Sequence, residues 1–240
     1  MMKNKTFPWL RILVHLFGIL PLARLGIDAL AGGLSINPIQ EIEQRLGRAA
    51  LYFLIASLAV TPLITLSGWR ALAPRRRALG LYAFLYASLH FTVFAAIDYG
   101  FDLVEIGRLV VEKPFILLGL STGLLLLPLA ITSFDLFMRK MGKRWKKLHR
   151  LVYLAGVAVI FHYALAKKGD LFALQGDILK PILWGVLLLC LFILRIPAVR
   201  RGVSGWRQKL TGFPVSRKQT GRESPPEAGM AEDPARQDGG

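Results

Sequence analysis

The sequence has 240 residues, of which 54% are hydrophobic and 19% are charged. This apolar fraction is high for a soluble domain and indicates a membrane protein. The single cysteine, Cys190, excludes an intramolecular disulfide framework, a site built from several thiolates, and haem attachment through a Cys-x-x-Cys-His motif.

Six apolar segments of about 20 residues, the length that a helix needs to cross a bilayer, alternate with polar loops. Their predicted limits are 9–31, 49–66, 79–97, 115–134, 148–166 and 178–196. The first could instead be a secretory signal, although it is longer than the apolar core of such signals. The sequence therefore predicts an all-α polytopic membrane protein, a six-helix transmembrane bundle over residues 9–201. Residues 1–8 precede the bundle, and the polar residues 202–240 are predicted to form a disordered tail.

The formal charge of +16 is distributed in blocks along the chain. The N-terminus, the second and fourth loops and the tail together hold 23 of the 31 Lys and Arg residues. Because short loops rich in Lys and Arg stay on the cytoplasmic side, both termini are predicted to be cytoplasmic. Membrane orientation explains the positive charge, so no nucleic-acid partner is predicted.

All four histidines, His15, His90, His149 and His162, lie in or at the edge of the apolar segments. Ionisable residues inside a membrane are costly and usually functional. His90 and His162 lie 11 and 14 residues into two segments that run in the same direction, which places both about 17 to 21 Å deep. Two imidazoles at one level can hold one iron from opposite sides, as in b-type haem. The alternative is that each histidine only makes an interhelical hydrogen bond.

The neighbours of this pair along the helices could accommodate a flat macrocycle. Residues at helical spacing are Ala155, Ala158 and Ala166 beside His162, and Tyr82, Tyr86 and Phe94 beside His90. Small residues would leave room for a porphyrin and the aromatic rings would line it. The alternative is that the alanines allow close helix packing and the aromatic residues fill the core.

The other two histidines are expected elsewhere. His149 lies 13 residues before His162, about 20 Å along a helix, so the two cannot bind the same iron. His149 and His15 both fall in the predicted cytoplasmic half and could ligate a second haem. Alternatively, His149 contacts a lipid or flavin phosphate, or both histidines are interfacial polar residues.

Several motifs carry a resemblance to a known family that extends over about residues 9–200. They are LGRA at 46–49, VTPL at 60–63, RRALGLYAFLYASLH at 76–90, Thr132-Ser133, and KRWKKLHRLVYLAGVAVIFHY at 143–163. On these motifs the sequence resembles the MsrQ family of haem-binding membrane subunits, within the wider ferric-reductase-like transmembrane family.

The resemblance implies a multi-pass protein of the bacterial inner membrane that binds haem b, with His90, His149 and His162 as the ligands. FMN is also associated with the family, but no residues can be assigned to it. Electrons would come from the quinone pool or a cytosolic flavin reductase. They would pass to a periplasmic MsrP-like molybdoenzyme, which reduces methionine sulfoxide in periplasmic proteins. The chain itself would be an electron-transfer subunit without catalysis of its own.

Two other functions remain open on the residues alone. A small-solute or ion transporter would have buried acids along a path, but only Asp28 lies inside a predicted segment, near its end. A cofactor-free assembly subunit would use its histidines only to join helices. The sequence has no G-x-G-x-x-G or Walker motif, so no nucleotide domain is predicted. The basic segment 139–150 could dock an electron donor or only fix the topology.

Overall fold

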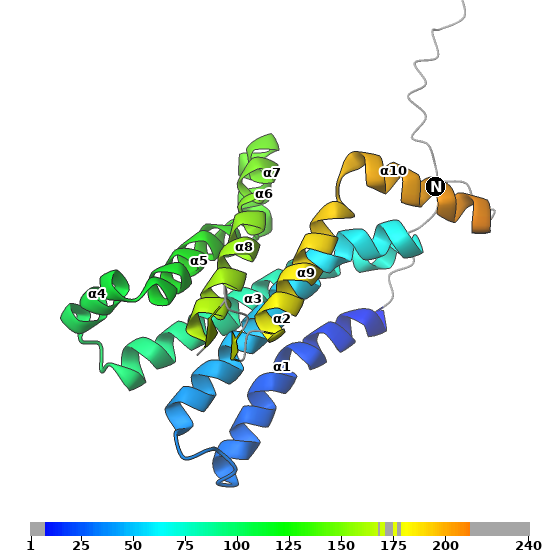
Figure 1. Ribbon diagram of the computed structural model, residues 1–240. Coiled ribbons are helices and arrows are strands. Elements are labelled where there is room, and N and C mark those ends of the chain that lie inside the picture. Colours follow the sequence, from blue (N-terminus) through cyan, green and yellow to red (C-terminus); the bar gives the residue numbers. More distant parts are fainter. Residues whose placement is uncertain (1–7, 168, 171–174, 177–178, 212–240) are drawn as a thin grey trace, which may run out of the picture.

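The computed structural model describes residues 8–167, 169–170, 175–176 and 179–211, and these are almost entirely helical (Figure 1). The elements are α1 (Pro8–Leu30), α2 (Pro38–Ser67), the 3-10 turn η1 (Arg70–Leu72), α3 (Arg75–Thr92), the π-helical η2 (Val93–Asp98), α4 (Leu103–Glu112), α5 (Pro114–Ile131), α6 (Asp135–Met141), α7 (Lys143–Leu148), α8 (Leu151–Ala166), β1 (Gly169–Asp170), β2 (Gln175–Gly176), α9 (Leu179–Ile193) and α10 (Pro197–Thr211). The strands β1 and β2 form a two-residue antiparallel ladder.

Among the described residues, five helical segments are long and apolar enough to cross a membrane, which confirms the predicted all-α polytopic class. They correspond to α1, α2, α3 with η2, α5, and α7 with α8. The sixth predicted segment differs, because α9 has only 15 residues, about 22 Å, and then bends by 79° into α10. Within the described part of the chain, the candidate for the sixth crossing is the bent pair α9 and α10.

Helix α2 begins 11 residues before the apolar segment predicted at residue 49. The Asn37 side chain caps it by accepting a hydrogen bond from the Gln40 backbone N–H at 3.2 Å, and Pro38 occupies the first turn. The polar first turns are held by Arg45, which bonds Asp28 of α1 and Glu41. A search for apolar segments misses these turns because they contain charged residues. The charges are accommodated because they pair with each other.

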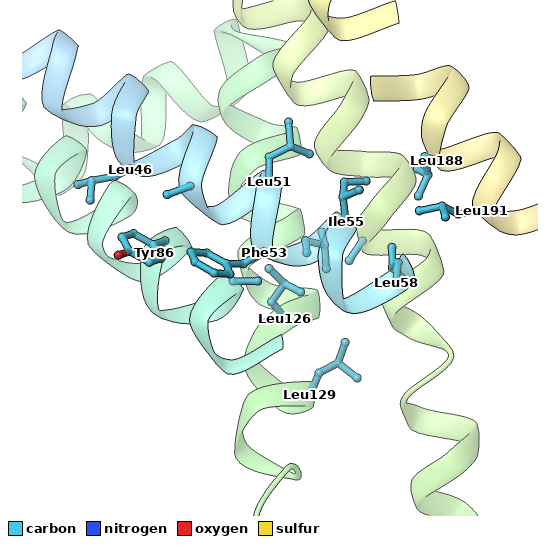
Figure 2. Close-up of a cluster of buried hydrophobic side chains, with 14 of the residues drawn as sticks. Leu46, Leu51, Phe53, Ile55, Leu58, Tyr86, Leu126, Leu129, Leu188 and Leu191 are labelled. Atoms are coloured by element: carbon cyan, nitrogen blue, oxygen red, sulfur yellow. The ribbon is translucent and has the colours of Figure 1, made fainter. Parts of the chain in front are cut away.

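The core lies around α2, which packs against α1, α3, α8, α9 and α10. Figure 2 shows buried side chains of this core, with labelled residues from α2, α3, α5 and α9. Phe53 of α2 stacks on Tyr86 of α3 with ring centroids 5.4 Å apart, and both are buried. The hydroxyl of Tyr86 donates a 2.6 Å hydrogen bond to the Gly18 carbonyl of α1, so its buried polar atom is satisfied.

Several segments outside the core differ from the prediction. Residues 103–112, expected in a loop, form the amphipathic helix α4, and the basic segment 139–150 contains the short helices α6 and α7. Residues 202–211 continue helix α10 where disorder was expected. The expected N-terminal segment up to residue 7 and the tail from residue 212 lie outside the described residues.

The helix ends fall into two groups along the bundle. In Figure 1 the start of α1, the start of α3 and α10 lie toward the upper right, with α6 and α7 also in the upper part. The connection between α1 and α2 and helix α4 lie toward the lower left. This grouping is the one expected for helices that cross in alternating directions.

Candidate functional site

The structure brings His90 of α3 and His162 of α8 together. Their imidazole centroids are 6.2 Å apart and the ring planes are inclined by 69°. Both side chains are partly buried between helices. The two rings therefore lie next to each other at one level, as the depth estimate from the sequence predicted.

Each imidazole is held by a backbone carbonyl of a neighbouring helix. Nδ1 of His90 lies 2.9 Å from the Glu43 carbonyl oxygen in α2, and Nδ1 of His162 lies 2.6 Å from the Phe115 carbonyl oxygen in α5. Because a carbonyl can only accept, Nδ1 carries the proton and donates in both rings. Nε2 of each neutral imidazole is then left with a lone pair, the form that binds a metal.

A glycine follows each of these carbonyls by four residues. Gly47 lies beside His90 and Gly119 lies beside His162. In an α-helix the N–H of residue i+4 lies next to the carbonyl of residue i. A side chain at position i+4 would therefore crowd a second donor, here the imidazole, that approaches the same carbonyl. A Cβ on Gly119 would lie 2.8 Å from Cε1 of His162, whereas a Cβ on Gly47 would lie 3.5 Å from the His90 ring. Glycine is thus required at position 119 and merely compatible at position 47.

The two halves of the site are related by a constant offset in sequence. Helices α2 and α3 provide one carbonyl, glycine and histidine, and helices α5 and α8 provide the other. Adding 72 to each position of the first set gives the second: Glu43, Gly47 and His90 become Phe115, Gly119 and His162. Neither glycine was predicted from the sequence as part of the site. The two histidines lie 72 residues apart in the sequence, and a search for glycines with the same spacing would have found Gly47 and Gly119.

The geometry of the pair fits an iron held between two imidazoles. Two metal–nitrogen bonds of about 2 Å, together with the radii of the two rings, span about 6 Å between centroids. The observed separation is 6.2 Å. Both Nε2 atoms are free of the carbonyl contacts, and two nitrogen ligands on opposite sides are the donor set of bis-histidine haem b. The residues present therefore fit this cofactor.

The aromatic residues expected to line the porphyrin point elsewhere. The hydroxyl of Tyr82 lies 3.0 Å from Nδ1 of His15 in α1, and Tyr82 and Tyr86 both pack against Phe53 of α2. Phe94 contacts the ring of Tyr99 instead. These three side chains belong to the packing between α1, α2 and α3 and to the end of η2, so this expectation was wrong.

The alanines near His162 also differ from expectation. Ala155 is fully buried in the core and Ala166 is exposed at the end of α8. The close approach to His162 is made by Gly119 of another helix. Room at the imidazole therefore comes from α5 rather than from the alanines of α8 itself.

His149 lies at the junction of α7 and α8, apart from the facing pair. Its ring stacks on Trp145 with centroids 4.1 Å apart, and its Nε2 lies 3.1 Å from the hydroxyl oxygen of Thr132. That hydroxyl donates its proton to the Pro128 carbonyl, so Nε2 of His149 is the donor in their contact. Only Nδ1 is left with a lone pair. His15 contacts Tyr82, so the structure gives His15 and His149 different surroundings.

The chain is similar to proteins of a known membrane family. Residues 46–160 match the family described as the ferric reductase like transmembrane component. The chain is 42% identical over 188 residues to the protein-methionine-sulfoxide reductase heme-binding subunit MsrQ of Herminiimonas arsenicoxydans, which covers 78% of this chain and 84% of that protein. Proteins of the same name match from Rhodospirillum rubrum, with 42% identity over 81% of this chain and 91% of the relative, and from Salmonella enteritidis, with 37% identity over 85% and 98%. No solved structure matches the chain.

Proposed function

Because this chain belongs to the MsrQ family of haem-binding subunits of protein-methionine-sulfoxide reductases, we propose that it carries electrons across a bacterial inner membrane through haem b. The observation that carries the proposal is the facing pair of His90 and His162, with each Nδ1 donating to a backbone carbonyl. When bound between them, haem b supplies a one-electron carrier in a low-dielectric interior.

The protein's own residues would hold this carrier and set its properties. His90 and His162 are the proposed axial ligands, each through Nε2. The carbonyls of Glu43 and Phe115 keep the imidazoles neutral at Nε2, fix their orientation and raise their basicity. Ligation from both sides leaves no open coordination position, so the site suits electron transfer rather than chemistry on a bound substrate.

The proposed direction of transfer follows from charge. We place both termini in the cytoplasm, because most Lys and Arg residues lie in the segments on that side. Electrons would enter there or from the membrane, from a cytosolic flavin reductase or the quinone pool. They would leave on the opposite side to a periplasmic MsrP-like molybdoenzyme, which would reduce methionine sulfoxide in periplasmic proteins. The exposed side chains of α7, Lys143, Arg144, Lys146 and Lys147, are the proposed contact for a cytosolic donor.

Two parts of the proposal rest on the family alone. His149 is proposed as a further haem ligand, for which it would use Nδ1 or give up its contact with Thr132. FMN is proposed as a second cofactor without assigned residues. Neither is needed for the function of the His90 and His162 pair.

The alternatives have less support. A transporter would need several free acids along a path. Asp28 is bonded to Arg45 and lies within 4.0 Å of Arg24, and Glu43 of α2, whose Oε1 is buried without a hydrogen-bond partner among the described residues, is a single such acid. A cofactor-free assembly subunit would have no need for two imidazoles 6.2 Å apart whose Nδ1 atoms both donate to backbone carbonyls. An optical spectrum of the purified full chain separates these functions. A Soret band with b-type bands after dithionite reduction supports the proposal, whereas a colourless preparation that retains its fold supports the alternatives.

A further inference from the structure

The side chains of Arg76 and Arg195 come together where α3 begins, at the opposite end of that helix from His90, and Arg75 precedes Arg76 in the chain. Arg75 and Arg76 open α3, and Arg195 follows α9. All three side chains are partly buried. The Nε atoms of Arg75 and Arg195 are inaccessible and have no hydrogen-bond partner among the described residues. Buried donors of this kind are rare in proteins and costly when they carry charge.

The position of Arg195 is fixed by a proline in α2. Pro62 has no N–H, so the carbonyl of Leu58 one turn earlier lacks its helical donor. Arg195 replaces that donor at 2.5 Å, and its other terminal nitrogen donates to the Tyr153 hydroxyl at 2.6 Å. The guanidinium carbon also lies 5.2 Å from the centroid of the Tyr153 ring. These contacts anchor Arg195 but neutralise none of its charge.

Arg76 and Arg195 meet at the same turn of α2: the Ser57 hydroxyl donates to the Arg76 carbonyl at 3.1 Å, and Arg195 donates to the carbonyl of the next residue, Leu58. Arg76 also interacts electrostatically with Arg195, Tyr153 and His149. None of these partners is an acid. None of the ion pairs among the described residues includes Arg75, Arg76 or Arg195. The next residue of the helix behaves differently, since Arg77 pairs with Asp135 at 2.6 Å.

We propose that Arg75, Arg76 and Arg195 bind a phosphate group between α2, α3, α8 and α9. Like charges held together away from water require an anion, and the planar donor fork of arginine matches phosphate oxygens. Basic pockets between transmembrane helices bind the headgroups of anionic lipids in this way. The phosphate belongs either to a phospholipid or to a soluble phosphomonoester.

The site is separate from the proposed haem site between His90 and His162, although Arg76 lies near His149, the further ligand proposed from the family. Arg76 precedes His90 by 14 residues of continuous helix, which corresponds to about 21 Å. Acidic side chains of a porphyrin held between His90 and His162 would be too far away to neutralise these arginines. The inference therefore stands independently of the proposed haem between His90 and His162; the haem spectrum of the variants shows whether a haem at His149 is involved instead.

The test uses the purified full chain and the variant Arg76→Gln, with Arg77→Gln as the matched control. Binding of FMN and of phosphate-free riboflavin is followed by flavin fluorescence, and binding of phosphatidylglycerol to the delipidated protein is followed by native mass spectrometry. We expect Arg76→Gln to lower the affinity for one of the two phosphate-bearing probes by about tenfold or more, as for a lost charge-assisted hydrogen bond. Arg77→Gln should leave that affinity unchanged.

The two binding measurements identify which kind of molecule supplies the phosphate group. Weaker binding of FMN with unchanged riboflavin assigns a soluble phosphomonoester, and weaker phosphatidylglycerol binding with unchanged FMN assigns a lipid. Arg76→Lys should restore part of the affinity, which separates lost charge from misfolding. Wild-type affinity of Arg76→Gln for both probes would overturn the proposal, as would a loss of haem from this variant with both affinities intact. The haem spectrum of the same preparations reports separately on the proposed function.

Discussion

The substitution Gly119→Ala tests how the imidazole of His162 is positioned. The new Cβ would lie 2.8 Å from Cε1 of His162, about 0.7 Å closer than the roughly 3.5 Å of ordinary carbon contact. If the ring moves away by this amount, its 2.6 Å hydrogen bond to the Phe115 carbonyl stretches to about 3.3 Å, beyond the usual range. Nε2 would move by several times the roughly 0.2 Å tolerance of a metal–nitrogen bond.

We therefore expect Gly119→Ala to lower haem affinity by about 10- to 100-fold, the range seen when an outer-shell contact of a metal ligand is lost. Gly47→Ala is the matched control, because its Cβ would lie at an ordinary 3.5 Å from the His90 ring. The assay is the haem-to-protein ratio of each purified variant, with circular dichroism to verify helix content. Full haem binding in Gly119→Ala, or an equal loss in both variants, would refute the reasoning.

Two further predictions concern the fold and the route of electrons. Arg195→Gln should leave the Leu58 carbonyl without a donor and cost about 1–3 kcal/mol, lowering the thermal midpoint in detergent. Pro62→Ala supplies the missing N–H and should recover part of that loss in the double variant; strictly additive effects would contradict the link between the two residues. Changing Lys143, Arg144, Lys146 and Lys147 to Gln should slow haem reduction by a cytosolic donor in inverted vesicles while haem content stays the same. An unchanged rate would leave these residues only their role in topology.

The helical membrane fold and the histidine pair were accessible from sequence for different reasons. Hydropathy located the membrane helices because a bilayer requires long apolar segments. His90 and His162 could be paired because helical rise converts sequence position into depth. Both inferences use quantities that are local to one helix.

Features that depend on contacts between helices were missed. The polar start of α2 was hidden because Arg45 pairs with Asp28 of α1, which hydropathy does not register. The roles of Gly47 and Gly119 depend on imidazoles that lie 43 residues later in the chain. The direction in which Tyr82 faces depends on which side of α3 is covered by α1. Helical periodicity places residues on a face but does not say which helix covers it.

The most direct test of the central claim is the haem content of three histidine variants of the purified chain. His90→Ala and His162→Ala should each lose most of the bound haem, because each removes one of the two neighbouring imidazoles that are the proposed ligands. His15→Ala, which alters a membrane histidine bonded to Tyr82, should keep it. Full haem in both His90→Ala and His162→Ala would contradict the account.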